Sequence, residues 1–433
     1  MLMQLITGSA EERRAFVDQL KKRGDEKDRR VEQTVAEILQ NVRENGDSAV
    51  RAYTEKFDGR APEKTEVSRK ELEDCLQSCD PKFRQALQDA ARNIRDFHER
   101  QKQQSWLTTR ADGTVMGQRV RGLHRVGIYV PGGTAAYPSS VLMNAIPAHV
   151  AGVGEIVMVT PPGKDGRPNP TIMAAAAVAG VDLVFLMGGA QAVAALAYGT
   201  ETVPRVDKIV GPGNIFVATA KKLLYGTVDI DMIAGPSEIL IVADDSANPR
   251  FLAADLMSQA EHDRLASAIL ITTSEKIAKQ TEQELALQVQ TLSRRAIIEE
   301  SLQHYGAMIV CDTMDEVVAF ANLLAPEHLE VCCREPMTYV GKLDNAGSVF
   351  LGHYSPEPLG DYFAGPNHVL PTSGTARFFS PLSVDSFVKK SSFIAYTKEA
   401  LLRDADEIVT LANAEGLTAH ANSIIVRQKE EKD

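Results

Sequence analysis

Two side chains of metal-binding type lie three positions apart in the helix-like segment Phe251–His262. This spacing places Gln259 and His262 on one face of the helix, where both could bind the same metal ion. Two ligands do not define a site, and the chain has neither an HExxH motif nor a CxxC pair. Later parts of the chain add three more side chains with suitable donor atoms: Asp361, His368 and His420.

A second pair, Glu327 and His328, comes directly before a strand-like apolar run. A histidine titrates near neutral pH and can accept a proton, and a carboxylate can activate water. The alternative is a solvated Glu-His pair with no chemical role. Cys332 and Cys333 continue the same run and raise the option of a thiol nucleophile. We interpret them instead as buried thiols of a strand, which are generally inert.

Three glycine-containing turns follow strand-like runs: Pro131–Gly133, Gly188–Gln191 and Gly211–Asn214. Turns of this kind allow backbone amides to approach a phosphate at the start of the next helix. Glycine also simply permits tight turns, and the full GxGxxG pattern is absent. Ligands of open α/β sheets bind at the carboxyl ends of strands. Three such turns in one lobe therefore favour a binding site, without identifying a dinucleotide.

Short apolar runs alternate with helical segments from Val126 onwards, which predicts parallel sheets covered on both faces. The expected strands are Val126–Val130, Ile156–Val159, Leu183–Leu186, Ile209, Ile239–Val242, Ala268–Ile271 and Met308–Val310. The runs Glu155–Val159 and Glu238–Val242 begin alike, which hints at two similar lobes. Residues 347–381 are rich in Gly, Pro and Ser, and a long loop of this kind is usually functional.

The first hundred residues have helical periodicity, and Ser9 with Glu12 and Ser68 with Glu71 fit the capping-box spacing. His98 and His304 have the pattern of ordinary helix-surface residues. Asp112-Gly113 between two apolar pairs predicts a hairpin. A last helical part is expected from Lys398 to about Val426.

Composition limits the classes of function. The chain has 433 residues, with 47 Lys and Arg against 58 Asp and Glu, for a net charge of −11. This length predicts two or three domains, and the acidic balance disfavours a nucleic-acid partner. Five scattered cysteines and no visible signal peptide predict a cytoplasmic protein. We interpret the uncharged stretch Leu183–Thr200 as a strand, a glycine turn and a helix, so no membrane association is expected.

Several long motifs resemble the histidinol dehydrogenase family. The resemblance runs from about residue 25 to His420, with no departure at the positions that matter. The matching segments are Val126–Gly133, Gly211–Asn214, Ala234–Glu238, Gln259–His262, Pro326–His328 and Gly360–Thr372, continuing to Phe378.

The resemblance implies a zinc enzyme that oxidises L-histidinol to L-histidine in two NAD-dependent steps, through an enzyme-held aldehyde. This reaction ends histidine biosynthesis. Carried over by motif, Glu327 and His328 are the acid/base residues. The implied zinc ligands are Gln259, His262, Asp361 and His420. The implied NAD contacts are Tyr129, Gln191 and Asn214. The implied substrate residues are Ser237, Gln259, His262, His328, Asp361, Glu415 and His420.

The same resemblance implies an α/β protein with two Rossmann-like lobes, and helical terminal segments that wrap or exchange in a homodimer. The expected parts are an N-terminal helical arm at 1–24, a substrate and zinc lobe at 25–125 and 238–381, an NAD-binding lobe at 126–237, and a C-terminal segment at 382–433 that completes the neighbour's site.

Three other functions stay open at this stage. A related NAD-dependent dehydrogenase would act on another small alcohol, such as a sulfonated diol, although Glu415 and the Ser237 motif favour histidinol. A zinc hydrolase would use Glu327 to activate water and would leave the glycine turns unexplained. A two-lobed binding protein would lie outside the cytoplasm, against the missing signal peptide.

Overall fold

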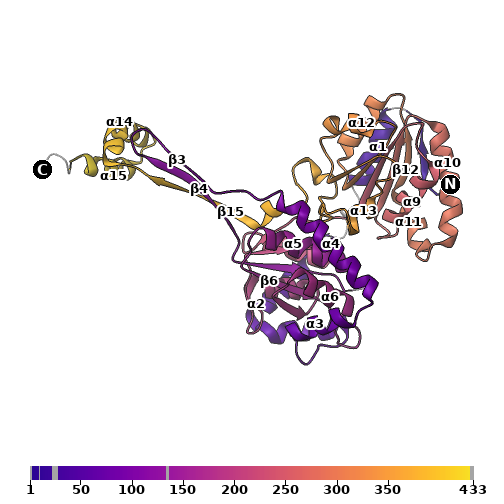
Figure 1. Ribbon diagram of the computed structural model, residues 1–433, viewed down its shortest axis with the longest axis horizontal. Helices are drawn as coiled ribbons and strands as arrows, with labels where there is room; N and C mark the ends of the chain where they lie inside the picture. Colours follow the sequence, from indigo (N-terminus) through magenta and orange to yellow (C-terminus); the bar gives the residue numbers. More distant parts are fainter. Residues whose placement is uncertain (1, 9, 22–27, 133–135, 430–433) are drawn as a thin grey trace. The chain divides into compact units, whose positions relative to one another are not determined.

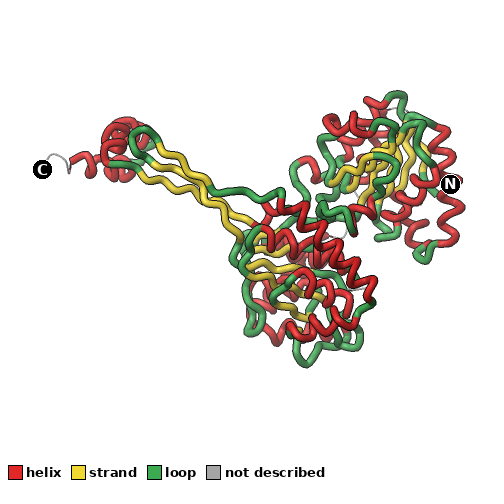
Figure 2. The backbone as a smooth tube through the Cα atoms, viewed as in Figure 1, coloured by secondary structure: helices red, strands yellow, loops and turns green. Residues whose placement is uncertain are grey.

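The computed structural model describes residues 2–8, 10–21, 28–132 and 136–429. The chain divides into two compact units, one made of Met1–Gln101 with Leu123–Phe387 and one of Lys102–Gly122 with Val388–Asp433. Figures 1 and 2 show their elements, and each unit is described by itself. The larger unit contains two six-stranded sheets.

The first sheet is fully parallel and has the order β1-β12-β11-β10-β13-β14. Its strands are nearly all apolar, as expected for a sheet that is buried on both faces. They are β1 (Gln4–Ile6), β10 (Glu238–Ala243), β11 (Ser267–Thr272), β12 (Gly306–Val310), β13 (His328–Cys332) and β14 (Ser348–Leu351).

Helices cover both faces of this sheet. One buried cluster joins it to α9 (Pro249–Ala260), α10 (Glu275–Gln288) and α11 (Arg295–Tyr305). A second cluster joins the opposite face to α1 (Ala10–Lys21) and α12 (Met314–Leu324). The short helix α13 (Glu357–Tyr362) follows β14.

The second sheet has the order β2-β7-β6-β5-β8-β9, and only its edge strand β2 runs antiparallel to its neighbour. The strands are β2 (Glu66–Val67), β5 (Arg125–Tyr129), β6 (Glu155–Thr160), β7 (Leu183–Leu186), β8 (Lys208–Val210) and β9 (Asp229–Ile230).

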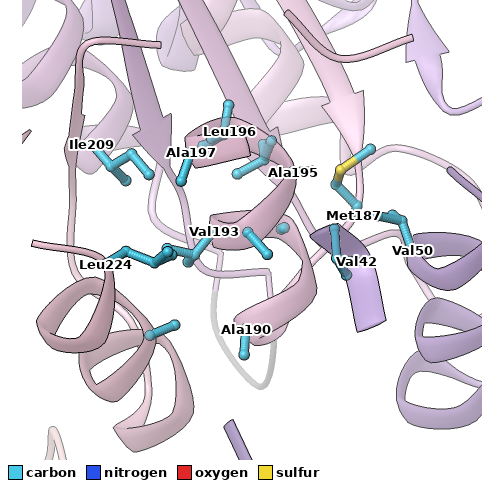
Figure 3. Packing of buried hydrophobic residues seen from close by; sticks show 14 of the residues in the cluster. Val42, Val50, Met187, Ala190, Val193, Ala195, Leu196, Ala197, Ile209 and Leu224 are labelled. Carbon is cyan, nitrogen blue, oxygen red and sulfur yellow. The ribbon is translucent and has the colours of Figure 1, made fainter. Parts of the chain in front are cut away.

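The core of this second lobe packs α2 (Asp28–Asp58), α7 (Gly189–Tyr198) and α8 (Ile215–Leu224) onto one face of the sheet. Figure 3 shows Val42 and Val50 of α2 beside Met187, with the small side chains of α7 between them and Leu224. Further helices pack on one another in the same lobe: α3 (Arg69–Ser78), α4 (Pro81–Glu99), α5 (Pro138–Val150) and α6 (Pro170–Ala179).

The two sheets share one strand order. In each, the chain runs outward from a central strand, β10 or β5, and then returns to pair with the other side of that strand. This pattern is the Rossmann-like order with a topological switch point. The predicted α/β class with parallel sheets is therefore confirmed. The two similar sequence runs fall on β6 and β10, which are not equivalent in this order, because β10 corresponds to β5.

The smaller unit is an antiparallel sheet followed by two helices. β4 (Val115–Gly122) lies between β3 (Trp106–Thr109) and β15 (Val388–Ala395), and α14 (Lys398–Ala414) and α15 (Thr418–Lys429) pack on each other. The hairpin predicted at Asp112-Gly113 is confirmed, with Thr109 paired to Val115. The helical C-terminal part is also confirmed, but β15 was not predicted.

The domain boundaries inferred from the resemblance differ from this packing. Residues 28–99 do not join the 238–381 lobe, because α2 supplies core residues to the second sheet and β2 pairs with β7. Residues 2–21 do not form a separate arm, because β1 pairs with β12 and Phe16 lies in the first lobe's core. The last unit begins at Val388 rather than at 382.

Local predictions gave mixed results. The Ser68–Glu71 capping box is present, whereas Ser9 lies outside the described residues. His304 is exposed as expected, but the prediction for His98 was wrong, because its side chain is fully buried. Its Nδ1 lies 2.9 Å from the Ile94 carbonyl oxygen, and its Nε2 faces the Asn367 amide at 3.4 Å.

The stretch Leu183–Thr200 forms β7, a glycine turn and α7, as predicted. Among the described residues, none of the helices combines the length and apolar character needed to cross a membrane.

Candidate active site

The predicted acid/base pair lies where two neighbouring strands of the first sheet begin. His328 is the first residue of β13 and pairs with Ile239, next to the start of β10. Gln259 lies near the end of α9, which runs back from the far end of β10. This site therefore forms at the amino ends of the strands. The glycine turns, by contrast, follow the carboxyl ends of strands in the second sheet.

His328 is held as a neutral base. The residue is 3% exposed, and its Nδ1 lies 3.0 Å from the Glu238 carbonyl oxygen. A carbonyl oxygen only accepts, so Nδ1 carries the proton and Nε2 keeps a free lone pair. Nε2 has no hydrogen-bond partner among the described residues. Burial lowers the pKa of His328 to about 4, against the opposing charge of Asp361.

Glu327 lies beside this imidazole and is 7% exposed. Its Oε2 accepts the backbone N–H of Glu238 at 2.8 Å and lies 3.7 Å from His328 Nδ1. The backbone of Glu238 therefore positions both members of the predicted pair, through its N–H for the carboxylate and its carbonyl for the imidazole.

Two carboxyl groups of α13 face the free nitrogen of His328. Nε2 is 3.8 Å from Glu357 Oε1 and 4.0 Å from Asp361 Oδ1. These three residues each offer one ligand atom, all within 4.8 Å of one another, so the group could hold a metal ion. Burial and the charge of Asp361 raise the pKa of Glu357 well above its usual value.

A cavity of about 220 Å³ opens on this cluster. His328, Asp361 and His368 line its polar side, and Phe350 and Leu359 line its apolar side. His368 is fixed by its Nδ1, 3.0 Å from the Asp361 carbonyl oxygen, and its Nε2 lies 3.5 Å from Ser140 Oγ. The cavity has the polar corner and apolar wall expected for a small amphipathic ligand.

Gln259 carries an unused polar group. It is fully buried, and neither atom of its amide has a hydrogen-bond partner among the described residues. An unpaired buried amide costs about 1–3 kcal/mol, so an absent ligand is expected to complete it. His262, three residues later, lies close enough to His328 that its charge would lower the His328 pKa. Imidazole, carboxylate and amide donors together fit zinc.

The remaining predicted substrate and metal residues are divided between the two units. Ser237 is partly buried directly before β10, where its carbonyl accepts the N–H of Ser267 at 3.0 Å. Glu415 and His420 belong to the smaller unit, where both are exposed at the junction of α14 and α15. Of the predicted ligands, the larger unit thus contains Gln259, His262 and Asp361.

Tyr129 connects the end of β5 to the glycine turn at Gly188-Gly189, whereas Gly133 of the first predicted turn lies outside the described residues. Tyr129 ends β5, and its hydroxyl oxygen accepts the N–H of Gly189 at 3.1 Å. Burial raises its pKa to about 12, so the hydroxyl stays protonated and can also donate. Gln191 is 1% exposed, and neither atom of its amide has a partner among the described residues. Two predicted NAD contacts therefore share one turn.

The third turn is built around a buried ion pair. Asp231 Oδ2 accepts the N–H of Gly211 at 2.8 Å, and Lys221 Nζ donates to the Gly211 carbonyl at 3.0 Å. Lys221 and Asp231 also pair with each other, and their side chains are 3% and 1% exposed. Gly211 has a φ of 110°, and a Cβ there would lie 2.2 Å from the Tyr129 carbonyl oxygen. Glycine is required at this close approach.

Asn214 has a local role in addition to the predicted one. It is the N-cap of α8, and its Oδ1 accepts the N–H groups of Phe216 and Val217 at 3.0 and 3.2 Å. Asn214, the third predicted NAD contact, is therefore also the residue that caps the helix after the turn.

The thiol alternative has no support from the geometry. Cys332 and Cys333 are 5% and 1% exposed. Burial raises the pKa of the Cys332 thiol above its usual value and that of Cys333 to about 12. Both thiols are therefore protonated and poorly nucleophilic at neutral pH.

Sequence reasoning missed Glu357, which contributes to the cluster as closely as Asp361 does. The only available signal was its place in the irregular segment 347–381, four residues before Asp361 in Pro-Glu-Pro-Leu-Gly-Asp. A spacing of four places two side chains on one helical face, but Pro356 and Pro358 obscured the helix.

The comparisons with known proteins give one consistent result. The histidinol dehydrogenase family model matches residues 21–428. A histidinol dehydrogenase from Clostridium acetobutylicum is 55% identical, and the match covers 99% of each chain. One from Listeria innocua is 53% identical over 99% of this chain and 100% of the relative. The crystal structure of a histidinol dehydrogenase from Elizabethkingia anophelis superimposes with a TM-score of 0.93 at 39% identity, covering 100% of this chain and 99% of that one.

Proposed function

This chain belongs to the histidinol dehydrogenase family, and on that premise we propose that it oxidises L-histidinol to L-histidine. The reaction takes two NAD-dependent hydride transfers through an aldehyde that stays on the enzyme. It is the last step of histidine biosynthesis. The observation that carries the proposal is the neutral, buried His328 with an unpartnered Nε2 at the wall of a small cavity.

In the first oxidation, His328 Nε2 accepts the alcohol proton as hydride leaves the carbinol carbon for the nicotinamide. The Nδ1–H bond to the Glu238 carbonyl holds the tautomer that leaves Nε2 free to accept. The products of this step are the aldehyde, NADH and one proton.

His328 releases its proton before the second oxidation. Glu327 then takes a proton from the water molecule that attacks the aldehyde carbon and returns it to the former carbonyl oxygen, which gives the hydrate. The hydrate then loses hydride to a second NAD, and His328 accepts the proton from its hydroxyl group. The fixed position of Glu327 on the Glu238 N–H supports this role, since the carboxylate is already oriented. Holding the aldehyde in the site prevents its loss between the two steps.

The proposed zinc ligands are Gln259, His262, Asp361 and His420. The unpartnered amide of Gln259 and the carboxylate of Asp361 beside the cavity support this set. Zinc bound there would supply Lewis acidity and an anchor for the imidazole and amine of the substrate. Ser237 and Glu415 are proposed to contact the substrate as well.

The proposed NAD contacts are Tyr129, Gln191 and Asn214. The protonated Tyr129 hydroxyl and the unpartnered Gln191 amide offer donors and acceptors beside the turn at Gly188-Gly189. This turn precedes α7, so its backbone amides also lie at a helix N-terminus that suits a phosphate.

The test is a product count with zinc-loaded protein, histidinol and NAD. Two NADH per histidine are expected. A hydrolase cannot oxidise an alcohol, so protein that forms neither NADH nor histidine from histidinol would contradict the proposed function. NADH formed with other small alcohols but not with histidinol would indicate the related dehydrogenase instead.

Glu327→Gln separates the two oxidations. The amide cannot activate water, so the variant is expected to form the first NADH at near-normal rate and then to stall. Stopped-flow absorbance of NADH measures this. Equal slowing of both hydride transfers would contradict the role of Glu327 in the second step.

We also propose that the protein is a homodimer in which each C-terminal segment completes the neighbour's site. Among the described residues, the apolar side chains that the smaller unit buries are all alanines, at 400, 405, 412 and 421. The same unit exposes Trp106, Leu107, Ile394, Leu411 and Val426. A unit that exposes this many large apolar side chains and buries only alanines is expected to cover some of them with a partner surface. Glu415 and His420 lie on this unit and are exposed.

Complementation tests the exchange. The variants His328→Asn and His420→Asn are each expected to be inactive. When they are unfolded and refolded together, about half of the dimers are mixed and each mixed dimer has one intact site, so about a quarter of the activity returns. No recovery in a mixture that chromatography shows to be dimeric would place His420 in its own chain's site.

The proposed setting is the cytoplasm. The free cysteines Cys75, Cys79, Cys311, Cys332 and Cys333 fit a reducing compartment.

A further inference from the structure

Two buried carboxyl groups lie next to the active-site cluster, where β13, α9 and α13 meet. Glu330 comes from β13, two residues after His328, and therefore points to the same side of the sheet. Asp255 comes from α9, one turn before Gln259. The carboxyl groups of Glu330 and Asp255 are hydrogen-bonded to each other.

The third element, α13, is attached to this pair through its backbone. Glu330 Oε1 accepts the N–H of Glu357 at 2.7 Å, and Glu330 is only 1% exposed. The N–H groups in the first turn of a helix have no partner within the helix. Glu330 therefore supplies the acceptor that the first residue of α13 needs in a buried position.

A second bond attaches α13 to α9. Ser258 Oγ lies 3.2 Å from Glu357 Oε2 and 2.8 Å from the Asp255 carbonyl oxygen, and its single proton is shared between these two acceptors. Both the backbone and the side chain of Glu357 are thus fixed. A helix of six residues has little stability of its own, so these anchors determine where it lies. Asp361, one turn later in α13, faces His328 Nε2 at 4.0 Å.

Glu330 can perform both roles at once because its carboxyl group is buried against that of Asp255 and also accepts the N–H of Glu357. Burial raises its pKa well above the usual value, and the nearby Asp255 raises it further. One proton shared by the two carboxyls lets Glu330 donate to Asp255 while its other oxygen accepts from Glu357. A hydrocarbon side chain would fill the same space, but it would leave the Glu357 N–H without an acceptor.

We propose that Glu330, hydrogen-bonded to Asp255, is a positioning residue that fixes the start of α13 and thereby the placement of Asp361 relative to His328 and Gln259. This inference rests on the proposed zinc-dependent function, because those three side chains are the ones that function uses. Glu330 itself contacts neither the substrate nor the reacting atoms.

The experiment compares Glu330→Gln with Glu330→Met. Glutamine keeps an acceptor for the Glu357 N–H and a donor to Asp255, whereas methionine has a similar length and neither group. Cys333→Ala, directly after β13 and buried in the cluster on the opposite face of the sheet, is the control for a general disturbance near this strand. Metal-free proteins are titrated with zinc alone against a chromophoric chelator, and kcat and both KM values are then measured on the zinc-saturated enzymes.

Glu330→Met is expected to weaken zinc binding about 10- to 100-fold and to raise the KM for histidinol, while the KM for NAD stays within about twofold. Glu330→Gln and Cys333→Ala are expected to stay near the wild-type protein in all three quantities. Wild-type zinc affinity in Glu330→Met would overturn the proposal. Equal impairment of Glu330→Gln and Glu330→Met would also overturn it. The variant that keeps the hydrogen bonds would then behave like the variant that loses them.

If Glu330→Met does not fold, Ser258→Ala tests the second anchor. It is expected to weaken zinc binding several-fold, and unchanged zinc binding would overturn the proposal. The two levels of inference remain separable. If wild-type protein fails to form two NADH per histidine, the proposed function is wrong. If it succeeds and the Glu330 variants match it, only the positioning role is wrong.

Discussion

The ion pair of Lys221 and Asp231 allows a prediction with a calculated size. Their side chains are 3% and 1% exposed, so the pair receives almost no solvent screening. In Lys221→Met, Asp231 would keep its N–H donors from Gly211 and Met232 but lose its cation. Removing one partner of a buried pair costs about 3–5 kcal/mol. We expect the free energy of unfolding to fall by that amount.

The double variant Lys221→Met/Asp231→Asn is the matched control. Asparagine removes the uncompensated charge and can still accept an N–H, so the main remaining loss is the bond from Lys221 to the Gly211 carbonyl. We expect a loss of about 1–2 kcal/mol. The double variant should therefore be more stable than the single one.

Urea denaturation of the metal-free proteins measures both free energies. Steady-state kinetics add a second quantity: the KM for NAD should rise in Lys221→Met, because the turn at Gly211 loses its support, while the KM for histidinol stays near wild type. A loss below about 1 kcal/mol in Lys221→Met, or a double variant as unstable as the single one, would refute the assignment of a desolvated pair that holds this turn.

Three further predictions concern single features of the larger unit. Gly211→Ala should lower stability and raise the KM for NAD, because its Cβ would lie 2.2 Å from the Tyr129 carbonyl oxygen; a variant with wild-type melting temperature would show that the turn can move. Cys332→Ala/Cys333→Ala should retain turnover within about twofold, and in native wild-type protein these two thiols should react with iodoacetamide far more slowly than after denaturation, since burial raises their pKa values. In metal-free protein the pKa of His328 is about 4, below the unfolded value of about 6.5, so the unfolded chain binds more protons between these values and stability falls as the pH is lowered. Between pH 7 and pH 5 the wild-type protein should lose about 2 kcal/mol more than His328→Asn, and parallel pH profiles for the two proteins would contradict the lowered pKa.

The strands that sequence could locate are those buried on both faces. β6, β10 and β11 appear as uninterrupted apolar runs because helices cover both sides of their sheets. The missed strands lie at edges or in solvent. β1 and β2 have three and two residues, and β15 is exposed along nearly its whole length, so none of them has a buried pattern.

The candidate site was predictable only where a motif names it. The resemblance pointed to His328, Gln259 and Asp361, and the structure brings His328 and Asp361 to one cavity, with Gln259 at the end of the neighbouring helix. It could not indicate Glu357 or Glu330, because their importance comes from one backbone hydrogen bond between distant segments. His98 was misjudged for the same reason, since its partner Asn367 is 269 residues away.

The three-stranded sheet of the smaller unit has a consequence for how the protein is made. β4 pairs with β15, and Thr397 donates a hydrogen bond to the carbonyl of Asp112, 285 residues earlier in the chain. On the ribosome, the early hairpin with its exposed Trp106 and Leu107 must wait until almost the whole polypeptide has emerged. Pairing between such distant segments is intrinsically slow. Chains released before residue 388 would therefore leave the backbone of β4 unpaired along one edge, which makes premature termination products natural targets for chaperones and proteases.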